Sequence, residues 1–237
     1  LDTGVNFSAV VTVDSPVLYG FYGLFGLFEG SFSRMPYYYK VREYNDFESR
    51  DLWSYDLHLT LAQIERLVDH LWELGWGKFD YYYLSKNCSY QILTALDAAL
   101  PEAGLAESLP PYVIPIDTVK ALARVPGLIK DVHYRPSIRR VFDERARGLS
   151  SEEKEALVDL SKGQSPDAIA PGFPPASRAR ILDAMMDYID LKYFRELVFE
   201  PEGEVAQWKR NTLLARSKIA ISSPPLPNQL ASSSFAQ

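Results

Sequence analysis

The sequence predicts an α+β protein with an aromatic, strand-rich first part and a helical second part. Of its 31 Phe, Trp and Tyr residues, 21 lie within residues 1–95, and aromatic residues favour strands. The remaining 142 residues hold only ten of them and instead show runs with the apolar spacing of helices. The change in composition therefore marks a change in secondary structure along the chain.

Composition and charge exclude several classes of protein. The chain has 237 residues, 47% apolar and 24% charged, which is typical of a globular protein. No run of about 18 apolar residues is present, so no membrane-spanning helix is predicted. The net charge of −6 argues against a nucleic-acid binder, which needs a basic face. Cys88 is the single cysteine, so no intrachain disulfide is expected.

The first part of the chain has the pattern of short strands joined by glycine-rich connections. Strands are predicted at residues 6–13 and 37–44, and most clearly at 52–59, where apolar and polar residues alternate. Residues 18–30 mix large apolar residues with four glycines, too many for a confident helix prediction. We interpret this segment as packed core or loop, for example a buried hairpin, or alternatively as an apolar surface that meets lipid.

A helix with a clear start signal follows the 52–59 strand. Thr60 is a suitable N-cap, and Gln63 three residues later completes a capping-box pattern. One apolar stripe continues from Leu61 to Trp72. Gly75 or Gly77 is expected to end the helix.

Cys88 lies at a predicted junction between a strand and a helix. Residues 79–84 have the composition of a strand, and residues 88–100 show helical spacing up to Pro101. Cys88 is therefore expected at or near the first turn of this helix. We consider this placement the most informative feature of the sequence.

The second part is predicted to be mostly helical. Helices are expected at 118–123, from Ser150 or Ser151 to Lys162, at 176–199 and at 204–219. A proline-rich loop or edge strand is expected at 109–117 and a linker at 163–175. The tail from Ser222 is expected to be disordered. The domain prediction is accordingly a thiol domain at 1–125, a helical extension at 126–221 and a tail at 222–237.

A cysteine at a helix start has chemical consequences. The partial positive charge and free N–H groups of a helix N-terminus favour the thiolate, and they can stabilise an oxyanion. Such a thiol still needs a base, usually histidine, within hydrogen-bond reach. The alternative is an inert core thiol, because Cys88, Ile92 and Leu96 share one helical face and free cysteines are often buried.

The segment YYYLSKNCSYQILTALDAA at 81–99 resembles the Asn-Cys-Ser/Thr motif of the Lnb N-terminal periplasmic domain family. Other segments similar in kind and order are NFSA (6–9), GLFGLFEGSFSRMPYYYKVREY (23–44), RDLWSYDLHLT (50–60), HLWELG (70–75) and VIPIDTVKAL (113–122). The resemblance covers residues 1–125 well and the helical remainder loosely. It implies a permuted papain-like, NlpC-related domain with an antiparallel sheet, located in the periplasm or cell envelope.

The resemblance also implies an activity. Better-understood relatives are lipoprotein N-acyltransferases, in which cysteine takes an acyl chain from a phospholipid and passes it to an amine. Carried over, Cys88 is the nucleophile, while Asn87 and Ser89 orient the thiol or shape the oxyanion site. Arg50 matches a family arginine that pairs with a phosphate or a carboxylate; the alternative is a structural ion pair.

The family's base histidine is expected in a Gly-His segment upstream of the matched part, and no Gly-His occurs in this chain. Either the chain is a fragment that lacks this histidine strand, which we favour, or a resident histidine substitutes. His58, on the polar face of a predicted strand, is the best substitute. His70 is expected to have a packing or hydrogen-bonding role, and His133 to lie in a loop.

No cofactor or metal site is predicted, because the aspartates of the second part have no metal-ligand spacing with His or Cys. The expected function is a cell-envelope thiol acyltransferase or amide hydrolase acting on lipid or lipoprotein, with peripheral membrane contact. Two alternatives stay open: a peptidoglycan amidase or peptidase, and a non-catalytic module that binds lipid or a partner. The sequence does not indicate an oligomeric state.

Overall fold

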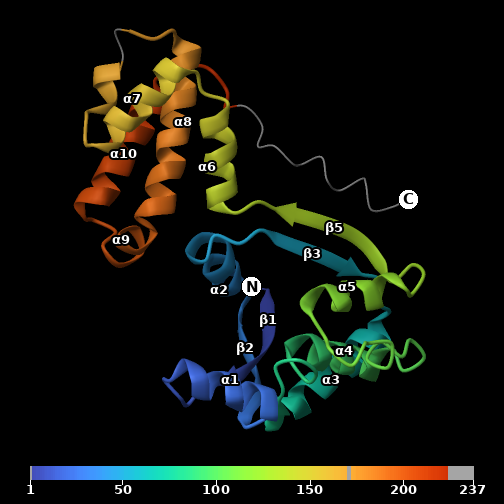
Figure 1. The fold of residues 1–237 in the computed structure, drawn as a ribbon. Coiled ribbons are helices and arrows are strands. Elements are labelled where there is room, and N and C mark those ends of the chain that lie inside the picture. Colours follow the sequence, from blue (N-terminus) through green and yellow to red (C-terminus); the bar gives the residue numbers. More distant parts are fainter. Residues whose placement is uncertain (1, 170–171, 224–237) are drawn as a thin grey trace. The chain divides into compact units, whose positions relative to one another are not determined.

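The computed structural model describes residues 2–169 and 172–223 and divides the chain into two compact units. The first unit comprises residues 1–39 and 55–132, and the second comprises residues 40–54 and the chain from His133 onward. The chain thus passes between units three times: within α2 (Tyr37–Val41), within β3 (Leu52–Leu57) and within β5 (Ile129–Arg135). Strands β3 and β5 pair in a two-stranded sheet (Figure 1). The mixture of small antiparallel sheets and many helices agrees with the expected α+β class.

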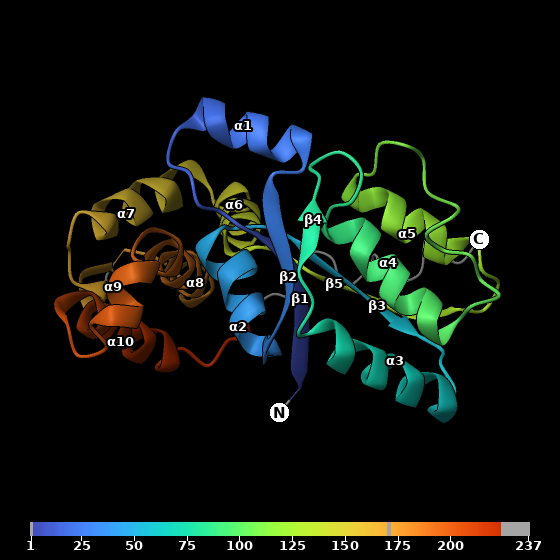
Figure 2. The same cartoon turned by 90° about the horizontal axis from the view of Figure 1, so that it is seen from below.

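A three-stranded antiparallel sheet organises the first unit. Its order is β1 (Thr3–Val10), β2 (Phe28–Pro36) and β4 (Phe79–Tyr81), with β2 in the middle (Figure 2). The register places Phe7 opposite Phe32, and their buried rings lie 4.9 Å apart between centroids. The aromatic residues that predict strands in this part of the sequence therefore form part of the sheet's core.

Residues 18–30 were predicted to form packed core or loop, for example a buried hairpin, or alternatively an apolar surface. The prediction of a hairpin is wrong. Residues Pro16–Phe25 form helix α1, whose C-cap Gly26 has the left-handed φ of 71°, and β2 begins two residues later. Proline at the first helical turn favours this start. Much of the helix's apolar surface is exposed, namely Val17, Leu18, Phe21, Leu24 and Phe25.

The predicted strand at residues 37–44 is also wrong. Residues Tyr37–Val41 form helix α2, which continues as a π-helical segment over Arg42–Phe47. The Lys40 ammonium lies 2.6 Å from the Glu43 carboxylate, a spacing of three residues that suits a helix. The aromatic run that suggested a strand thus takes part in local helical contacts.

Helix α3 (Leu61–Leu74) begins as predicted. The Gln63 N–H donates to Thr60 Oγ1 at 3.4 Å, and the Thr60 N–H donates to Gln63 Oε1 at 2.8 Å, which confirms the capping box. Helix α3 lies beside α4 (Cys88–Ala99), as Figure 2 shows. A second apolar core, which also involves α5 (Pro115–Ala123), contains Leu93, Leu96, Leu105, Ala121, Leu122 and Leu128.

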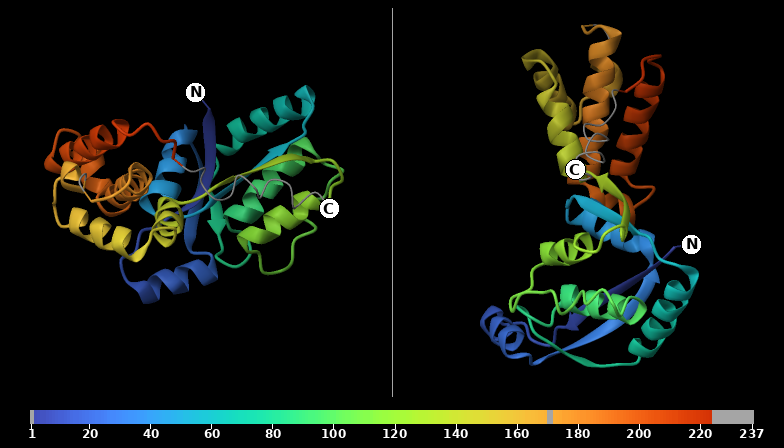
Figure 3. Two further views of the ribbon diagram at one scale, coloured as in Figure 1. Left: turned by 90° about the horizontal axis from the view of Figure 1, so that it is seen from above. Right: turned by 90° about the vertical axis from the view of Figure 1, so that its right-hand side faces the viewer.

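The second unit is built around helix α8 (Pro175–Lys192). Helices α6 (Ile138–Arg147), α7 (Ser151–Ser161) and α10 (Glu204–Ser217) all pack against α8, and Figure 3 shows α6, α8 and α10 side by side. The helix expected over 176–199 is interrupted at Tyr193, where α9 (Phe194–Phe199) begins. The sequence analysis assigned no element to β5 or α6. The predicted disordered tail falls mainly on residues 224–237, outside the described residues.

Helix α8 carries charged side chains into the interior of the second unit. The buried Asp183 carboxylate lies 2.7 Å from Arg216 Nε, and Asp187 lies 2.8 Å from Arg145. Burial raises the pKa of Asp187 to about 6; Arg145 opposes this increase, and the neighbouring Asp190 and Asp183 reinforce it. The folded chain therefore favours the protonated form of Asp187, even though the Arg145 guanidinium lies beside it.

Candidate active site

Cys88 is the first residue of helix α4, which confirms its predicted position at the start of a helix. Cys88 is half-buried. The preceding strand β4 ends at Tyr81, so six residues join the strand to the helix. Helix α4 runs for 12 residues, and the partial positive charge of its N-terminus lies beside Cys88.

Asn87 fixes the start of this helix. Its Oδ1 accepts from the N–H groups of Ser89 at 3.0 Å and Tyr90 at 3.4 Å. Its Nδ2 donates to the backbone oxygens of Tyr83 at 3.1 Å and Val113 at 2.7 Å. All four hydrogen-bonding positions of the amide are thus used by backbone groups. Asn87 therefore positions the first turn of α4, and with it Cys88.

Ser89 lies directly after Cys88 and is buried, with 4% of its surface exposed. Its backbone N–H is already bound by the Asn87 side chain. This N–H is consequently not free to receive an oxyanion while the cap is intact.

Two tyrosines that the sequence analysis did not select surround Cys88 and the segment before it. The Tyr81 hydroxyl is close enough to the backbone N–H of Cys88 for the two groups to interact electrostatically. Burial raises the pKa of Tyr81, and the proximity of Cys88 raises it further. The Tyr83 ring lies 6.1 Å from the Tyr81 ring, between centroids. The run of three tyrosines at 81–83 was the available signal for both residues.

Tyr19 of α1 also belongs to this aromatic cluster. Its hydroxyl lies 2.5 Å from the Tyr83 hydroxyl, and this hydrogen bond raises the pKa of Tyr83 to about 12. The contact joins residues 64 positions apart, so no local sequence pattern could have indicated it. Helix α1, with its exposed apolar side chains, is thereby tied to the segment that leads into Cys88.

The structure places the three histidines on different elements. His58 follows β3, is exposed, and donates its backbone N–H to the oxygen of Leu128 at 2.7 Å. His70 lies in α3, with Nδ1 3.9 Å from a Glu73 carboxylate oxygen. His133 lies in β5 and not in a loop, so that expectation is wrong. Within the described part of the chain, the contacts of His58 and His70 do not include Cys88.

Arg50 belongs to the second unit, whereas Cys88 belongs to the first. The Arg50 side chain is 65% exposed and lies 2.9 Å from a Glu48 carboxylate oxygen. Its guanidinium carbon also lies 5.9 Å from the centre of the Tyr44 ring. The contact with Glu48 is an ion pair within the second unit, the alternative considered for Arg50.

The neighbouring Asp51 has a structural role that the sequence analysis missed. Its carboxylate accepts from the Tyr134 hydroxyl and the Ser137 N–H, both at 2.8 Å. Burial by itself raises the pKa of Asp51, but these hydrogen bonds and the nearby Arg140 outweigh it and hold the pKa below its ordinary value. Part of the RDLW segment is thus used to anchor the end of β5.

An apolar groove of about 560 Å³ lies between the β1–β2 pair and the C-terminal half of α3. Val68 and Trp72 of α3 line one side and remain more than half exposed. Val5 and Arg34 line the strand side. Part of the apolar stripe predicted for α3 therefore faces this groove instead of the core.

Two other kinds of site were sought in the described residues. Across 2–169 and 172–223, no three His, Cys, Asp or Glu side chains are grouped so that they could hold a metal ion. None of the helices in that same part of the chain has the length and apolar character needed to cross a bilayer.

Comparison with known proteins gives two family matches. Residues 1–125 match the Lnb N-terminal periplasmic domain, and residues 132–227 match a domain of unknown function, DUF7842. No curated protein and no solved structure matches the chain. The first match covers more than half of the 237 residues, so the chain belongs to the Lnb N-terminal periplasmic domain family and is a protein of the periplasm or bacterial cell envelope.

Proposed function

We propose that this protein is a cell-envelope thiol enzyme, an acyltransferase or amide hydrolase that works through a thioester on Cys88. The observation that carries the proposal is the position of Cys88, half-buried at the first residue of α4. A helix start supplies the partial positive charge that favours a thiolate nucleophile. We further propose that the first unit is a permuted papain-like, NlpC-related domain whose histidine-bearing strand precedes the cysteine helix.

In the proposed reaction, the Cys88 thiolate attacks the carbonyl carbon of an ester or amide. The resulting tetrahedral oxyanion collapses, the bond to the leaving alcohol or amine breaks, and the leaving group takes a proton from an imidazolium. The product is an acyl thioester. An amine or water then attacks the thioester, gives up its proton to the imidazole, and releases the Cys88 thiol.

Residues around Cys88 have distinct proposed roles. Asn87 is a positioning residue, because its side chain is fully engaged with backbone groups that hold the helix start. Ser89, which is buried and directly follows Cys88 in the chain, is a second positioning residue. Tyr81, whose hydroxyl interacts with the backbone N–H of Cys88, is the proposed O–H donor to an oxyanion. His58 is the candidate base within this chain.

The proposed substrate is a lipid or lipoprotein acyl group, with peripheral contact to the membrane. Helix α1 supports this proposal, since it exposes Phe21, Leu24 and Phe25 and is hydrogen-bonded through Tyr19 to the segment before Cys88. Arg50 is the proposed ligand for a phosphate or carboxylate of the substrate and would have to release Glu48 to bind it.

The single cysteine makes the test direct, because any thiol labelling reports one site. The purified chain is treated with a thiol-directed acyl probe, alongside Cys88→Ala and His58→Ala. We expect a covalent adduct on Cys88, none on Cys88→Ala, and slower labelling of His58→Ala. Mass spectrometry of an adduct trapped from envelope extract then distinguishes a fatty acyl from a peptidyl group. Labelling no stronger than in Cys88→Ala would contradict the thioester mechanism.

The apolar groove favours a second candidate, a non-catalytic envelope module that binds lipid or a partner. Trp72 and Val68 expose apolar surface of the kind that such a module would use. Binding of phospholipid vesicles by Cys88→Ala at the level of the unaltered chain, with no acyl adduct on the latter, would favour this module over the enzyme.

A further inference from the structure

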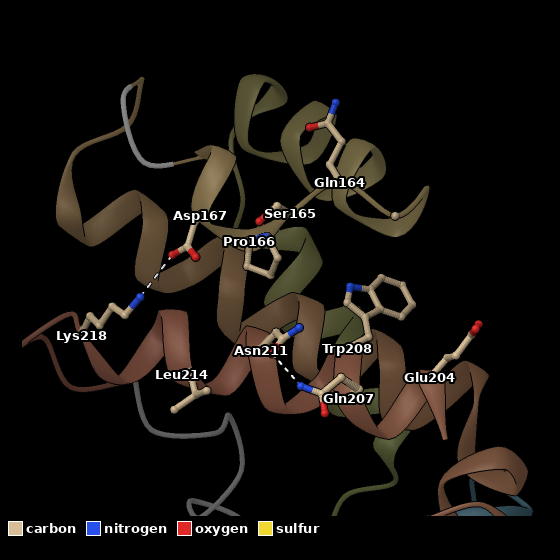
Figure 4. Close-up of a pocket in the computed structure, with 11 residues that line it drawn as sticks. Gln164, Ser165, Pro166, Asp167, Glu204, Gln207, Trp208, Asn211, Leu214 and Lys218 are labelled. Atoms are coloured by element: carbon tan, nitrogen blue, oxygen red, sulfur yellow. Dashed lines mark hydrogen bonds and ion pairs between the residues drawn. The ribbon is translucent and has the colours of Figure 1, made fainter. Parts of the chain in front are cut away.

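The second unit contains a polar pocket of about 660 Å³, within the range of about 300–1,000 Å³ typical of small-molecule sites. The pocket lies between the segment 163–167 and one side of α10 (Figure 4). Trp208 and Asn211 line it from α10, Lys218 lines it just after the end of this helix, and Gln164 and Asp167 line it from the opposite segment. All of these residues belong to the second unit, whereas Cys88 belongs to the first.

Several polar groups of this pocket have unused hydrogen-bonding capacity among the described residues. Asn211 Oδ1 accepts from Gln207 Nε2 at 3.0 Å, which leaves the Asn211 Nδ2 donor free. Gln164 has a side-chain amide without a hydrogen bond to any described residue. Figure 4 shows this amide extending away from α10, so a rotation of the side chain would bring its donor and acceptor to a ligand in the pocket. The Trp208 Nε1 is buried and has no acceptor among the residues that the structure describes, which is unfavourable for a polar group.

The charges around the pocket do not favour an anion. Lys218 lies 3.4 Å from Asp167, so this cation is already paired. Glu204, which also lines the pocket, adds a carboxylate that has no ion pair among the described residues. A phosphate or carboxylate ligand would therefore meet an acidic rim without a free lysine to bind it.

We infer that this pocket binds a neutral saccharide. A sugar ring has an apolar face of C–H groups that can pack on the Trp208 indole, and its hydroxyls both donate and accept. The hydroxyls therefore match the mixture of amide donors, amide acceptors and carboxylate better than a ligand that only donates or only accepts. The inference assigns a ligand class to the second unit and does not depend on the reaction proposed for Cys88.

Two neutral trisaccharides, chitotriose and maltotriose, serve as probes, and inorganic phosphate as the anionic comparison. Binding to the full chain is measured by calorimetry and by intrinsic tryptophan fluorescence. We expect saturable binding of at least one trisaccharide. Trp208→Ala should weaken it at least about tenfold, and Asn211→Ala and Gln164→Ala at least about threefold each. Trp76→Ala changes an exposed tryptophan of the first unit and should leave the affinity unaltered.

Trp208 also packs against the core of the second unit, so Trp208→Ala can lower its stability. Trp208→Phe keeps a ring but removes the N–H, and the variants at Asn211 and Gln164 change only side chains at the pocket. The inference is overturned if neither trisaccharide binds, if binding is the same in the Asn211 and Gln164 variants, or if phosphate binds more tightly than both sugars. Loss of binding in Trp76→Ala with retention in Trp208→Phe would move the site to the first unit and likewise overturn it.

Discussion

Tyr83 packs directly on the backbone of Gly23. The Tyr83 N–H donates to the Gly23 oxygen at 2.8 Å, and the Tyr83 ring occupies the space that a Cβ on Gly23 would need. The backbone oxygen of Tyr83 in turn accepts from Asn87, the N-cap of α4. A continuous series of contacts therefore links helix α1 to the helix that begins with Cys88.

This packing predicts opposite effects for two glycines of the same helix. Gly23→Ala should lower the free energy of unfolding by about 1–3 kcal/mol, because its methyl group overlaps the Tyr83 ring. Gly20→Ala is the matched control, since nothing lies within 4 Å of a Cβ there. Alanine is the better helix former, so this change should raise stability by about 0.5–1 kcal/mol. Chemical denaturation measures both; equal effects would contradict the contact.

The hydroxyl pair of Tyr19 and Tyr83 predicts a change in titration. The hydrogen bond to Tyr19 is the main cause that raises the pKa of Tyr83 to about 12. Tyr19→Phe removes this partner, so the pKa of Tyr83 should fall toward its ordinary value near 10. Ultraviolet titration of tyrosinate, compared between Tyr19→Phe and Tyr22→Phe, measures the shift. An unchanged titration in Tyr19→Phe would show that the two hydroxyls are not bonded in solution.

Asn87 is predicted to contribute stability as well as geometry. Asn87→Ala removes the cap of α4 and leaves the oxygens of Tyr83 and Val113 without their donor. We expect a loss of about 2 kcal/mol in the free energy of unfolding. Asn87→Ser keeps an acceptor for the cap but loses both amide donors, and it should lie between the unaltered chain and Asn87→Ala. A loss within experimental error for Asn87→Ala would exclude this role.

The Asp187 carboxyl predicts a pH dependence of the second unit. Its pKa is raised from 3.8 to about 6, so the folded chain binds this proton more tightly than the unfolded chain. The contribution of this group to stability is complete below the pKa of 3.8 in the unfolded chain and is lost as the pH rises through the pKa of about 6 in the folded chain. The free energy of unfolding should therefore fall by up to about 3 kcal/mol over that window from this group alone.

Asp187→Asn tests this dependence. The variant has no carboxyl to titrate, so its stability should change less between about pH 4 and about pH 7 than that of the unaltered chain. Asp51 has a lowered pKa and acts in the opposite sense, but only as the pH falls below its ordinary value. Denaturation at several pH values measures the difference between the two curves. Parallel curves would show that Asp187 does not titrate in this range.

Signals carried by neighbouring residues were sufficient for part of the fold and of the candidate site. The capping box at Thr60 and the helix start at Cys88 are confirmed, because a cap is read from residues within three positions. The predictions of a hairpin at 18–30 and a strand at 37–44 were wrong, because the structure of a segment also depends on contacts with residues far away in the sequence. The Tyr83 ring packs on Gly23 and the Tyr82 ring on Gly26, and composition alone could not reveal these contacts between distant parts of the chain.

The candidate site shows the same division. The position of Cys88 and the cap at Asn87 follow from local sequence, whereas the contact of Tyr83 with Tyr19 is set by the tertiary fold. Arg50 was selected through family resemblance. Its ion pair with Glu48, two residues earlier in the chain, could not be established from the sequence alone. The catalytic roles stay predictions that the labelling experiment addresses.

The exchange of chain segments within β3 and β5 bears on how fragments of this protein will behave. A piece that ends near residue 125, where the first family match stops, would carry residues 40–54 away from the unit to which they belong. It would also lack β5, the pairing partner of β3, and so expose an open strand edge to aggregation. The first family match includes residues 40–54, which belong to the second unit, so neither matched segment is expected to be excised cleanly as an autonomous folding module.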